Sequence, residues 1–418
     1  MFVETLENRN LVAYETTLHV AEYVNYFSKI WHECNSEFPP FENIYAKKEK
    51  VRCENEIEKF FNTIKKDARK NGINKFETCR VDEKYSSAIK TFLRERLNFK
   101  NEQLEILFSE NFLKVSGEFI KMARDFDPSI KPEEIFQACR NVWAMNWVQL
   151  LLGLPIEMTP SIFAYSMLYP CTDNFLDDPG ISFEDKSSFN HRLTERLLGE
   201  NIKPSGPNEQ IIYKLIGMIE TQFDRLYYPQ VFESLLAIHS AQIKSLLLLD
   251  SDKVIGEKDL LNISIEKGGT SVLADGYLAA GNLTETQEKF LFGYGAYLQL
   301  VDDMQDALDD SVNRFTTIFS NEAGKRMLDA LANRLYHFGE EVILGVESLD
   351  VEKLDPIVEL MKRTNELLII NSVGFANEYY SSSYIRQIEC YSPFSFSFLQ
   401  KRHDSFMHSG LTFIKSSY

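Results

Sequence analysis

The sequence is poor in the residues that interrupt helices. Only 19 glycines and 13 prolines are spread over 418 residues. The alternation of apolar and polar positions that is typical of strands is hard to find, whereas apolar residues recur at three- and four-residue spacing along most of the chain. These absences exclude a fold built mainly of short strands and turns, and they predict an all-α protein.

Paired cysteines, excess basic charge and long apolar runs are also missing. The six cysteines form no Cys-x-x-Cys pair, so neither a disulfide framework nor a zinc site is indicated. The formal net charge of −17 argues against nonspecific nucleic-acid binding. No apolar run approaches the roughly 18 residues of a membrane span, and the acidic first residues lack the apolar segment of a signal peptide. We therefore expect a cytoplasmic protein with no transmembrane segment and no nucleic-acid partner.

What the sequence does contain is an apolar helical interior and a charged N-terminal region. Residues 134–154 are apolar on nearly all sides, which predicts a central, buried helix, and Pro132 is well placed to begin it. Residues 199–210 form the clearest predicted loop. Because the first part of the chain is richer in charge, we expect an N-terminal helical region, 1–125, that packs on or extends a larger helical domain, 126–418.

Two groups of aspartates stand out against this apolar background. The first comprises Asp173, Asp177 and Asp178, which close an expected helix just before a Pro-Gly pair. Residues four apart share a face of a helix, and the carboxyl end of a helix already carries partial negative charge. Carboxylates at this place are better explained by bound cations than by helix stability.

The second group lies within residues 297–310, where Asp302, Asp306 and Asp310 are spaced by four and form one row on a helix. Asp303 adds a second pairing with Asp306. Oxygen ligands of this kind suit Mg²⁺, which is usually held by one or two carboxylates together with substrate phosphates. A single acidic run is most often a solvated helix face. Two runs that both adjoin apolar segments favour a metal clamp around a diphosphate instead.

Between the two groups, Lys267 lies in an apolar helical pattern and is followed by Gly268 and Gly269. The two glycines are expected to loosen or kink the helix. A lysine at such a break is suited to contact a diphosphate. The alternative is a side chain that extends to the surface.

With these residues in view, segment 259–310 resembles the trans-isoprenyl diphosphate synthase and class I terpenoid synthase superfamily. Lys267 resembles the lysine of the family's lysine-threonine helix, and residues 173–178 take the place of its first aspartate-rich motif. The family's Gln-x-x-Asp-Asp-x-x-Asp signature is matched by Gln299, Asp302, Asp303 and Asp306.

The resemblance implies a helical bundle around a deep apolar cavity, in which several Mg²⁺ ions bridge the aspartates and the diphosphate of a linear allylic prenyl substrate. Metal ions and cationic side chains would draw off the diphosphate, and the cavity would steer the carbocation. The expected metal ligands are Asp173, Asp177, Asp178, Asp302, Asp303, Asp306 and Asp310. The expected catalytic set is Asp173, Asp177, Asp302 and Asp306. The expected substrate-binding residues are Lys267, Arg140, Gln299, Arg314 and Arg386.

The three arginines in that set rest on their positions alone. Arg140 and Arg314 each have acidic neighbours in the sequence, with which they could form ordinary ion pairs instead. Arg386 is chosen because late basic residues reach the site in terpene cyclases.

The motifs that distinguish chain elongation, cyclisation and head-to-head condensation do not all point to one reaction. Chain-elongating members carry a Gly-Gly-Lys-Arg type motif near the N-terminus and paired arginines after the first aspartate motif, but here only Arg192 and then Arg196 follow it. Bacterial terpene cyclases place metal ligands at i, i+4 and i+8, which Asp302, Asp306 and Asp310 reproduce in spacing. Squalene and phytoene synthases, which join two prenyl diphosphates head to head, repeat Asp-x-x-x-Asp, and that pattern also occurs twice here.

We therefore expect a one-substrate terpene synthase, a lyase of isoprenoid biosynthesis. The first alternative is a prenyltransferase, either chain-elongating or head-to-head. A noncatalytic regulatory relative and a metal-binding helical protein unrelated to isoprenoids are further alternatives. A homodimer is compatible with each interpretation.

Overall fold

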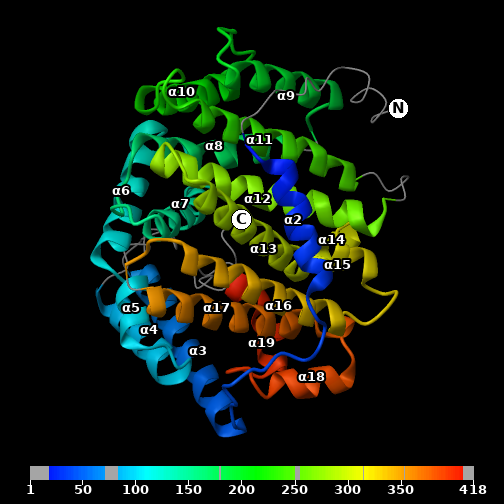
Figure 1. The fold of residues 1–418 in the computed structure, drawn as a ribbon. Helices are drawn as coiled ribbons and strands as arrows, with labels where there is room; N and C mark the ends of the chain where they lie inside the picture. Colours follow the sequence, from blue (N-terminus) through cyan, green and yellow to red (C-terminus); the bar gives the residue numbers. More distant parts are fainter. Residues whose placement is uncertain are drawn as a thin grey trace.

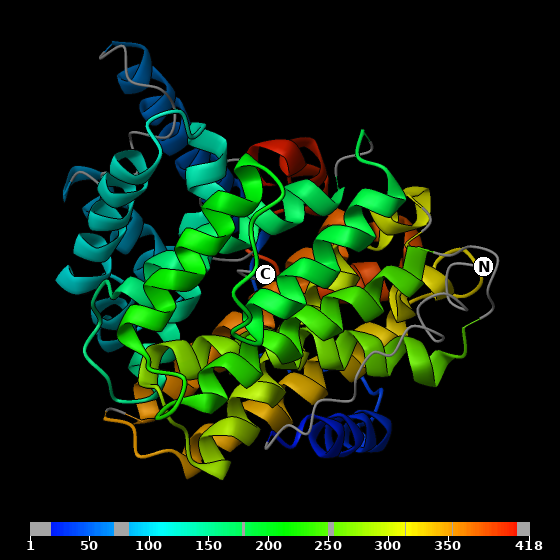
Figure 2. The same cartoon turned by 90° about the horizontal axis from the view of Figure 1, so that it is seen from above.

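The computed structural model describes residues 18–70, 83–177, 180–249, 255–313, 315–352 and 354–407. Every regular element in these ranges is a helix, so the prediction of an all-α fold is confirmed. Figures 1 and 2 show the helices arranged in layers, with two long helices running side by side through the centre. These central helices are α12 (Glu257–Ala280) and α13 (Glu285–Gln305).

The other helices cover the central pair from several sides. Above it in Figure 1 lie α8 (Pro160–Asp177), α9 (Phe183–Leu197), α10 (Pro207–Gln222) and α11 (Pro229–Ser245), and to its left lie α6 (Glu110–Phe126) and α7 (Pro132–Leu151). Below it lie α3 (Lys47–Lys70), α4 (Glu83–Arg96), α5 (Asn101–Leu107), α16 (Asp329–Leu344), α17 (Leu354–Phe375), α18 (Ser382–Glu389) and α19 (Phe396–Met407). Three short 3-10 helices follow α11, α16 and α17, namely η2 (Leu246–Leu249), η3 (Gly345–Ser348) and η4 (Asn377–Tyr379). Short helices α14 (Ala307–Asn313) and α15 (Ile318–Glu322) follow α13, and α2 (Val20–Glu33) lies on the outer face.

Glycines allow the two central helices to approach closely. A Cβ atom on Gly268 would lie 2.3 Å from the carbonyl oxygen of Gly295, and one on Gly269 would lie 2.5 Å from the ring of Phe292. α12 nevertheless runs without interruption through both glycines, so the expected loosening of the helix is wrong. The physical reason is that these glycines leave room for a neighbouring helix rather than relaxing their own backbone.

Helices α7 and α8 confirm the expected buried interior. α7 begins at Pro132, as predicted, and most of its side chains are buried. α8 contains Pro170 within the helix, and its early residues are buried on nearly all sides. The predicted loop over 199–210 is observed from Gly199 to Gly206, after which α10 begins at Pro207.

The N-terminal region packs on the rest of the chain through two sets of contacts. α2 packs on α12, α13 and α16, while α5 packs on α17. The Arg363 guanidinium of α17 donates to the backbone oxygen of Leu97 at 3.1 Å and to the Tyr45 hydroxyl at 2.8 Å. The predicted division into residues 1–125 and 126–418 stays a prediction.

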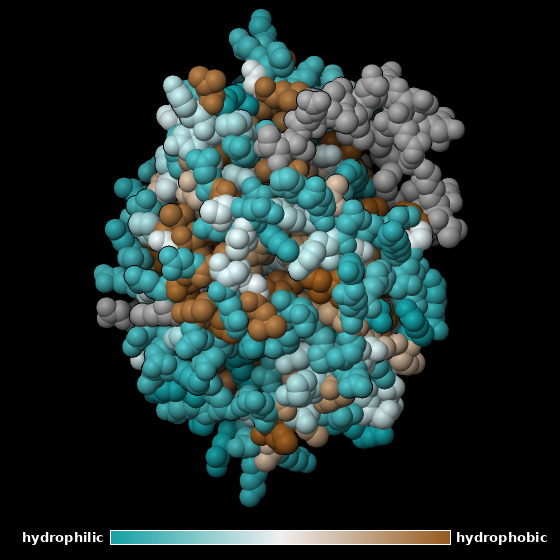
Figure 3. Space-filling model, viewed as in Figure 1, coloured by the Kyte–Doolittle hydropathy of each residue, from teal (hydrophilic) through white to brown (hydrophobic). Residues whose placement is uncertain are grey.

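The outer surface is mixed in polarity. Figure 3 shows hydrophobic side chains gathered in a band across the middle of one face, with hydrophilic residues above and below. Of the helices in the described ranges, none combines the length and hydropathy needed to cross a bilayer. The cysteines of these ranges are free thiols, as the sequence predicts.

Candidate active site at the carboxyl end of α13

The second aspartate group is split by a helix end. α13 ends at Gln305, and Asp306 caps it with φ −94° and ψ 6° before α14 begins. The single continuous helix expected for the row is therefore wrong. The spacing survives, however, because Asp306 N–H donates to the Asp302 carbonyl at 2.9 Å and Asp310 N–H donates to the Asp306 carbonyl at 2.8 Å.

The electrostatics show that the aspartates of this group act on one another. Burial, followed by the charges of Asp303, Asp306 and Asp302, raises the pKa of Asp310 to about 8, and Lys267 opposes this rise. These four carboxyl groups and Lys267 therefore share one local field. We call this group of five residues the acidic site.

Asp303 is held in a fixed position within the acidic site. The Ser264 hydroxyl donates to its Oδ2 at 2.6 Å, and the Gln299 amide donates to its Oδ1 at 2.8 Å. The side chain is only 4% exposed. Burial raises its pKa, while both hydrogen bonds and Lys267 act against that rise.

Two consequences follow for the sequence predictions. Gln299, which was predicted to bind substrate, bonds to Asp303, so the observed contact is one that positions a carboxylate. Ser264 was missed, although it lies one turn before Gly268 on the face of α12 that meets α13. Serines are common in helices, so nothing in the sequence marks Ser264 as a partner of Asp303.

Lys267 lies half-buried on α12, directly before the close contact of α12 with α13. Its neighbour Glu266 is paired with Lys244. The Lys267 carbonyl accepts from the Thr270 hydroxyl at 3.2 Å, whereas its ammonium group forms no hydrogen bond or ion pair within the described part of the chain. Its charge acts on Asp303 and Asp310 through space.

Asp173 and Asp177 of the first aspartate group lie on α8, which contacts α12. The Ser161 hydroxyl near the start of α8 donates to the Leu278 carbonyl near the end of α12 at 2.7 Å. This bond joins the start of α8 to the end of α12. The expected approach of the first aspartate group to Lys267 stays a prediction.

Several predicted residues fall outside what the structure describes. Asp173 and Asp177 are the last-turn residues of α8 by backbone, but their side chains, Asp178 and Arg314 lie outside the described residues. Arg140 is half-buried on α7. Arg386 is exposed on α18, which packs on α17. The roles predicted for these residues stay predictions.

The donor chemistry of the acidic site fits Mg²⁺. Carboxylate oxygens are hard ligands, and the last turn of α13 contains no basic residue to balance them. Among the described residues, no three carboxylate, imidazole or thiol groups gather closely enough to surround one ion. An ion bound here would therefore complete its shell with water or substrate phosphates, as Mg²⁺ commonly does.

The arginines that follow the first aspartate group are bound to carboxylates. Arg192 contacts Glu209 with nitrogen–oxygen distances of 2.5 to 3.1 Å, and the Ser205 N–H adds a bond to the same carboxylate. Although burial opposes it, these bonds hold the pKa of Glu209 below its usual value.

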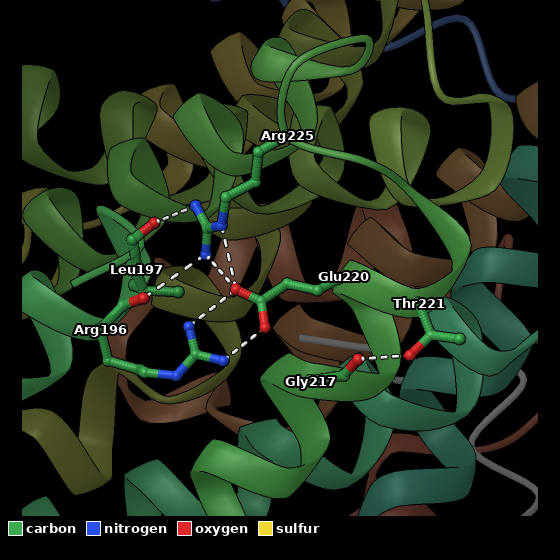
Figure 4. A network of polar contacts seen from close by, with 6 residues as sticks. All are labelled: Arg196, Leu197, Gly217, Glu220, Thr221 and Arg225. Atoms are coloured by element: carbon green, nitrogen blue, oxygen red, sulfur yellow. Dashed lines mark hydrogen bonds and ion pairs between the residues drawn. The ribbon is translucent and has the colours of Figure 1, made fainter. Parts of the chain in front are cut away.

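Glu220 makes a similar arrangement with two arginines (Figure 4). It accepts from Arg196 at 2.7 Å and from Arg225 at 2.8 Å, and Arg225 also donates to the Leu197 carbonyl at 2.6 Å. Burial acts against ionisation, yet the two arginines hold the pKa of Glu220 below its usual value. These guanidinium groups therefore tie α9, α10 and the segment before α11 together.

Comparison with known proteins adds little to this description. No family model matches the chain, and no curated protein matches it. Among solved structures, a geranylgeranyl pyrophosphate synthetase from the archaeon Geoglobus acetivorans is similar over 70% of this chain and 98% of that chain, at 12% sequence identity and a TM-score of 0.38. A similarity at this level does not assign the chain to a family.

Proposed function

We propose that the protein is a Mg²⁺-dependent class I isoprenoid enzyme. It ionises a linear allylic prenyl diphosphate at the acidic site and converts the resulting carbocation to a terpene. The observation that carries this proposal is the grouping of Asp302, Asp303, Asp306 and Asp310 with Lys267 near the carboxyl end of α13. Like charges at the negative end of a helix repel one another, and a bound divalent cation relieves that repulsion.

Each residue of the acidic site has a role in this proposal. Asp302, Asp306 and Asp310 would each contribute to holding one of several Mg²⁺ ions, with one or two carboxylates to an ion. When bound, these ions would withdraw charge from the departing diphosphate. Asp303, held by Ser264 and Gln299, supplies a fixed negative charge that keeps the site attractive to cations. Lys267 would bind a diphosphate oxygen. Asp173, Asp177 and Asp178 at the end of α8 would bind metal from the opposite side.

The pairing of the arginines favours a one-substrate reaction. Chain elongation needs cationic side chains for a second diphosphate. Arg192 is bound to Glu209, and Arg196 is bound to Glu220. Because each would have to leave a buried or half-buried carboxylate to bind a second substrate, we place terpene synthesis before prenyl transfer. Cytoplasmic location, a homodimeric assembly and the depth of the hydrocarbon cavity remain predictions.

The test is product analysis with the purified chain. The protein would be incubated with Mg²⁺ and geranyl, farnesyl or geranylgeranyl diphosphate, with and without isopentenyl diphosphate. We expect a hydrocarbon or alcohol and released diphosphate from at least one substrate without isopentenyl diphosphate. Longer diphosphates formed only when isopentenyl diphosphate is present would establish prenyl transfer instead. No turnover of any substrate would leave the regulatory alternative.

A further inference from the structure

A separate cavity lies on the other side of the molecule from α8–α11, between the N-terminal helices and α17. Its volume is about 540 Å³, and its walls come from α3, α4, α5 and α17, from residues that flank α5, and from one residue preceding α19. The walls are mainly large apolar side chains, among them Phe60, Ile89, Phe92, Leu97, Phe108 and Phe394. The volume falls in the range of about 300–1,000 Å³ that is typical of small-molecule sites.

The threonines in the walls do not offer free hydrogen-bonding groups. Thr63, Thr91 and Thr364 each donate their hydroxyl to a backbone carbonyl one turn earlier in their own helix, at 2.8, 2.9 and 2.8 Å. A hydroxyl engaged in this way is a poor anchor for a polar ligand.

The charged groups at the edge of the cavity are also accounted for. Glu56 accepts from the Arg96 guanidinium at 2.7 and 2.9 Å, so its charge is balanced within the protein. Lys59 is exposed to solvent. Most of the described side chains that line the cavity are apolar.

We propose that this cavity binds one long hydrocarbon chain, of the isoprenoid or the acyl type. Apolar walls of this kind favour the transfer of hydrocarbon from water. A peptide segment would bring backbone N–H and C=O groups that need partners, which these walls do not provide. A hydrocarbon chain needs none, and its polar head would remain at the mouth beside Ala88 and Thr91, which are both exposed. This site is independent of the acidic site and of the reaction proposed there.

The test uses the full chain and a variant that fills the cavity. Ala88→Trp would place an indole in the cavity mouth. Arg94→Trp is the matched control, since Arg94 lies on the same helix, is exposed, and does not line the cavity. Binding of farnesol and of palmitate, each kept below its aggregation concentration, would be measured by isothermal titration and native mass spectrometry.

We expect one molecule of at least one probe to bind per chain, with affinity at least tenfold weaker in Ala88→Trp and unchanged in Arg94→Trp. Farnesol alone would assign the isoprenoid type, and palmitate alone the acyl type. Binding of neither probe, or equal binding by the two variants, would overturn the proposal. If Ala88→Trp does not fold by circular dichroism, Thr91→Phe tests the same wall. Terpene formation is expected to be unchanged in Ala88→Trp, so failure here is distinguishable from failure of the proposed function.

Discussion

Carboxylates in two regions of this protein meet opposite surroundings. Around α9 and α10, Glu209 and Glu220 are held by arginines of the same chain (Figure 4). At the acidic site, burial and then the charges of three neighbouring aspartates raise the pKa of Asp310, and Lys267 opposes this rise. The first region balances its charge within the chain. Under the proposed function, a bound divalent cation would offset the repulsion at the acidic site.

The largest expected effect comes from removing charge at the acidic site. Asp302→Asn combined with Asp306→Asn should lower turnover of a prenyl diphosphate by at least about 100-fold, because metal stabilisation of the leaving group is worth several kcal/mol. The stabilisation of the folded chain by Mg²⁺ should also be lost, because two of the expected ligands are gone. Turnover assays and thermal unfolding with and without Mg²⁺ measure both quantities.

Asp309→Asn is the matched control for that double variant, because Asp309 is a neighbouring but exposed aspartate. It should retain activity and the stabilisation by Mg²⁺. Full activity in the double variant would remove the metal model. Equal loss of activity in Asp309→Asn would show that general negative charge, rather than this row, is what matters.

The contact between α12 and α13 sets the distance from Lys267 to the aspartates. Gly268→Ala would place a Cβ 2.3 Å from the Gly295 carbonyl oxygen, so the helices must separate, and the free energy of unfolding should fall by up to about 3 kcal/mol. Gly217→Ala on α10 is the control, because its Cβ would meet nothing within 4 Å, and it should stabilise by about 0.5–1 kcal/mol. Urea unfolding measures both. Equal effects would contradict the close packing.

Removing the shared carboxylate of the arginine region should reduce stability rather than chemistry. Glu220→Gln leaves Arg196 and Arg225 without their anion, and we expect the free energy of unfolding to fall by about 1–3 kcal/mol. This value already allows for solvent screening, because the groups are partly exposed. Glu195→Gln, which removes only an exposed contact with His191, should change stability by less than about 0.5 kcal/mol. Urea unfolding at neutral pH separates the two. A large loss of turnover in folded Glu220→Gln would instead connect this region to the reaction.

Asp275 shows a third way to accommodate a carboxyl group. It is fully buried on α12, neither oxygen has a hydrogen-bond partner in the described part of the chain, and burial raises its pKa well above the usual value. A raised pKa stabilises the fold at low pH, and that contribution is lost as pH rises above the unfolded value near 4.

Asp275→Asn removes this pH dependence, because its side chain does not ionise. Relative to wild type, the variant should gain about 1.4 kcal/mol per pH unit above roughly pH 4, until Asp275 ionises in the folded state. Urea unfolding of both proteins from pH 4 to pH 8 measures the difference. Parallel stability profiles would show that Asp275 is ionised in the folded protein and has found a partner.

Much of the fold was predictable because helix formation is local. The period of the apolar residues and the position of Pro132 mark the start and burial of α7 without knowledge of its neighbours. The prediction for Gly268 and Gly269 was wrong because the packing of one helix on another is not local. Within one helix a glycine weakens the structure, and only the presence of α13 against α12 turns Gly268 into a packing contact.

For the site, the sequence alone determined which residues are acidic, their four-residue spacing and the nearby lysine on a separate helix, since these depend on residue type and helical period. Tertiary structure decided the rest. Ser264 and Gln299 bond to Asp303 from two helices, and the helix that carries the aspartate row ends before Asp306. The arginines that follow the first aspartate group are paired with glutamates of α10. Such contacts depend on how helices pack. Carboxylates that look alike in the sequence therefore differ in their electrostatic surroundings once the chain has folded.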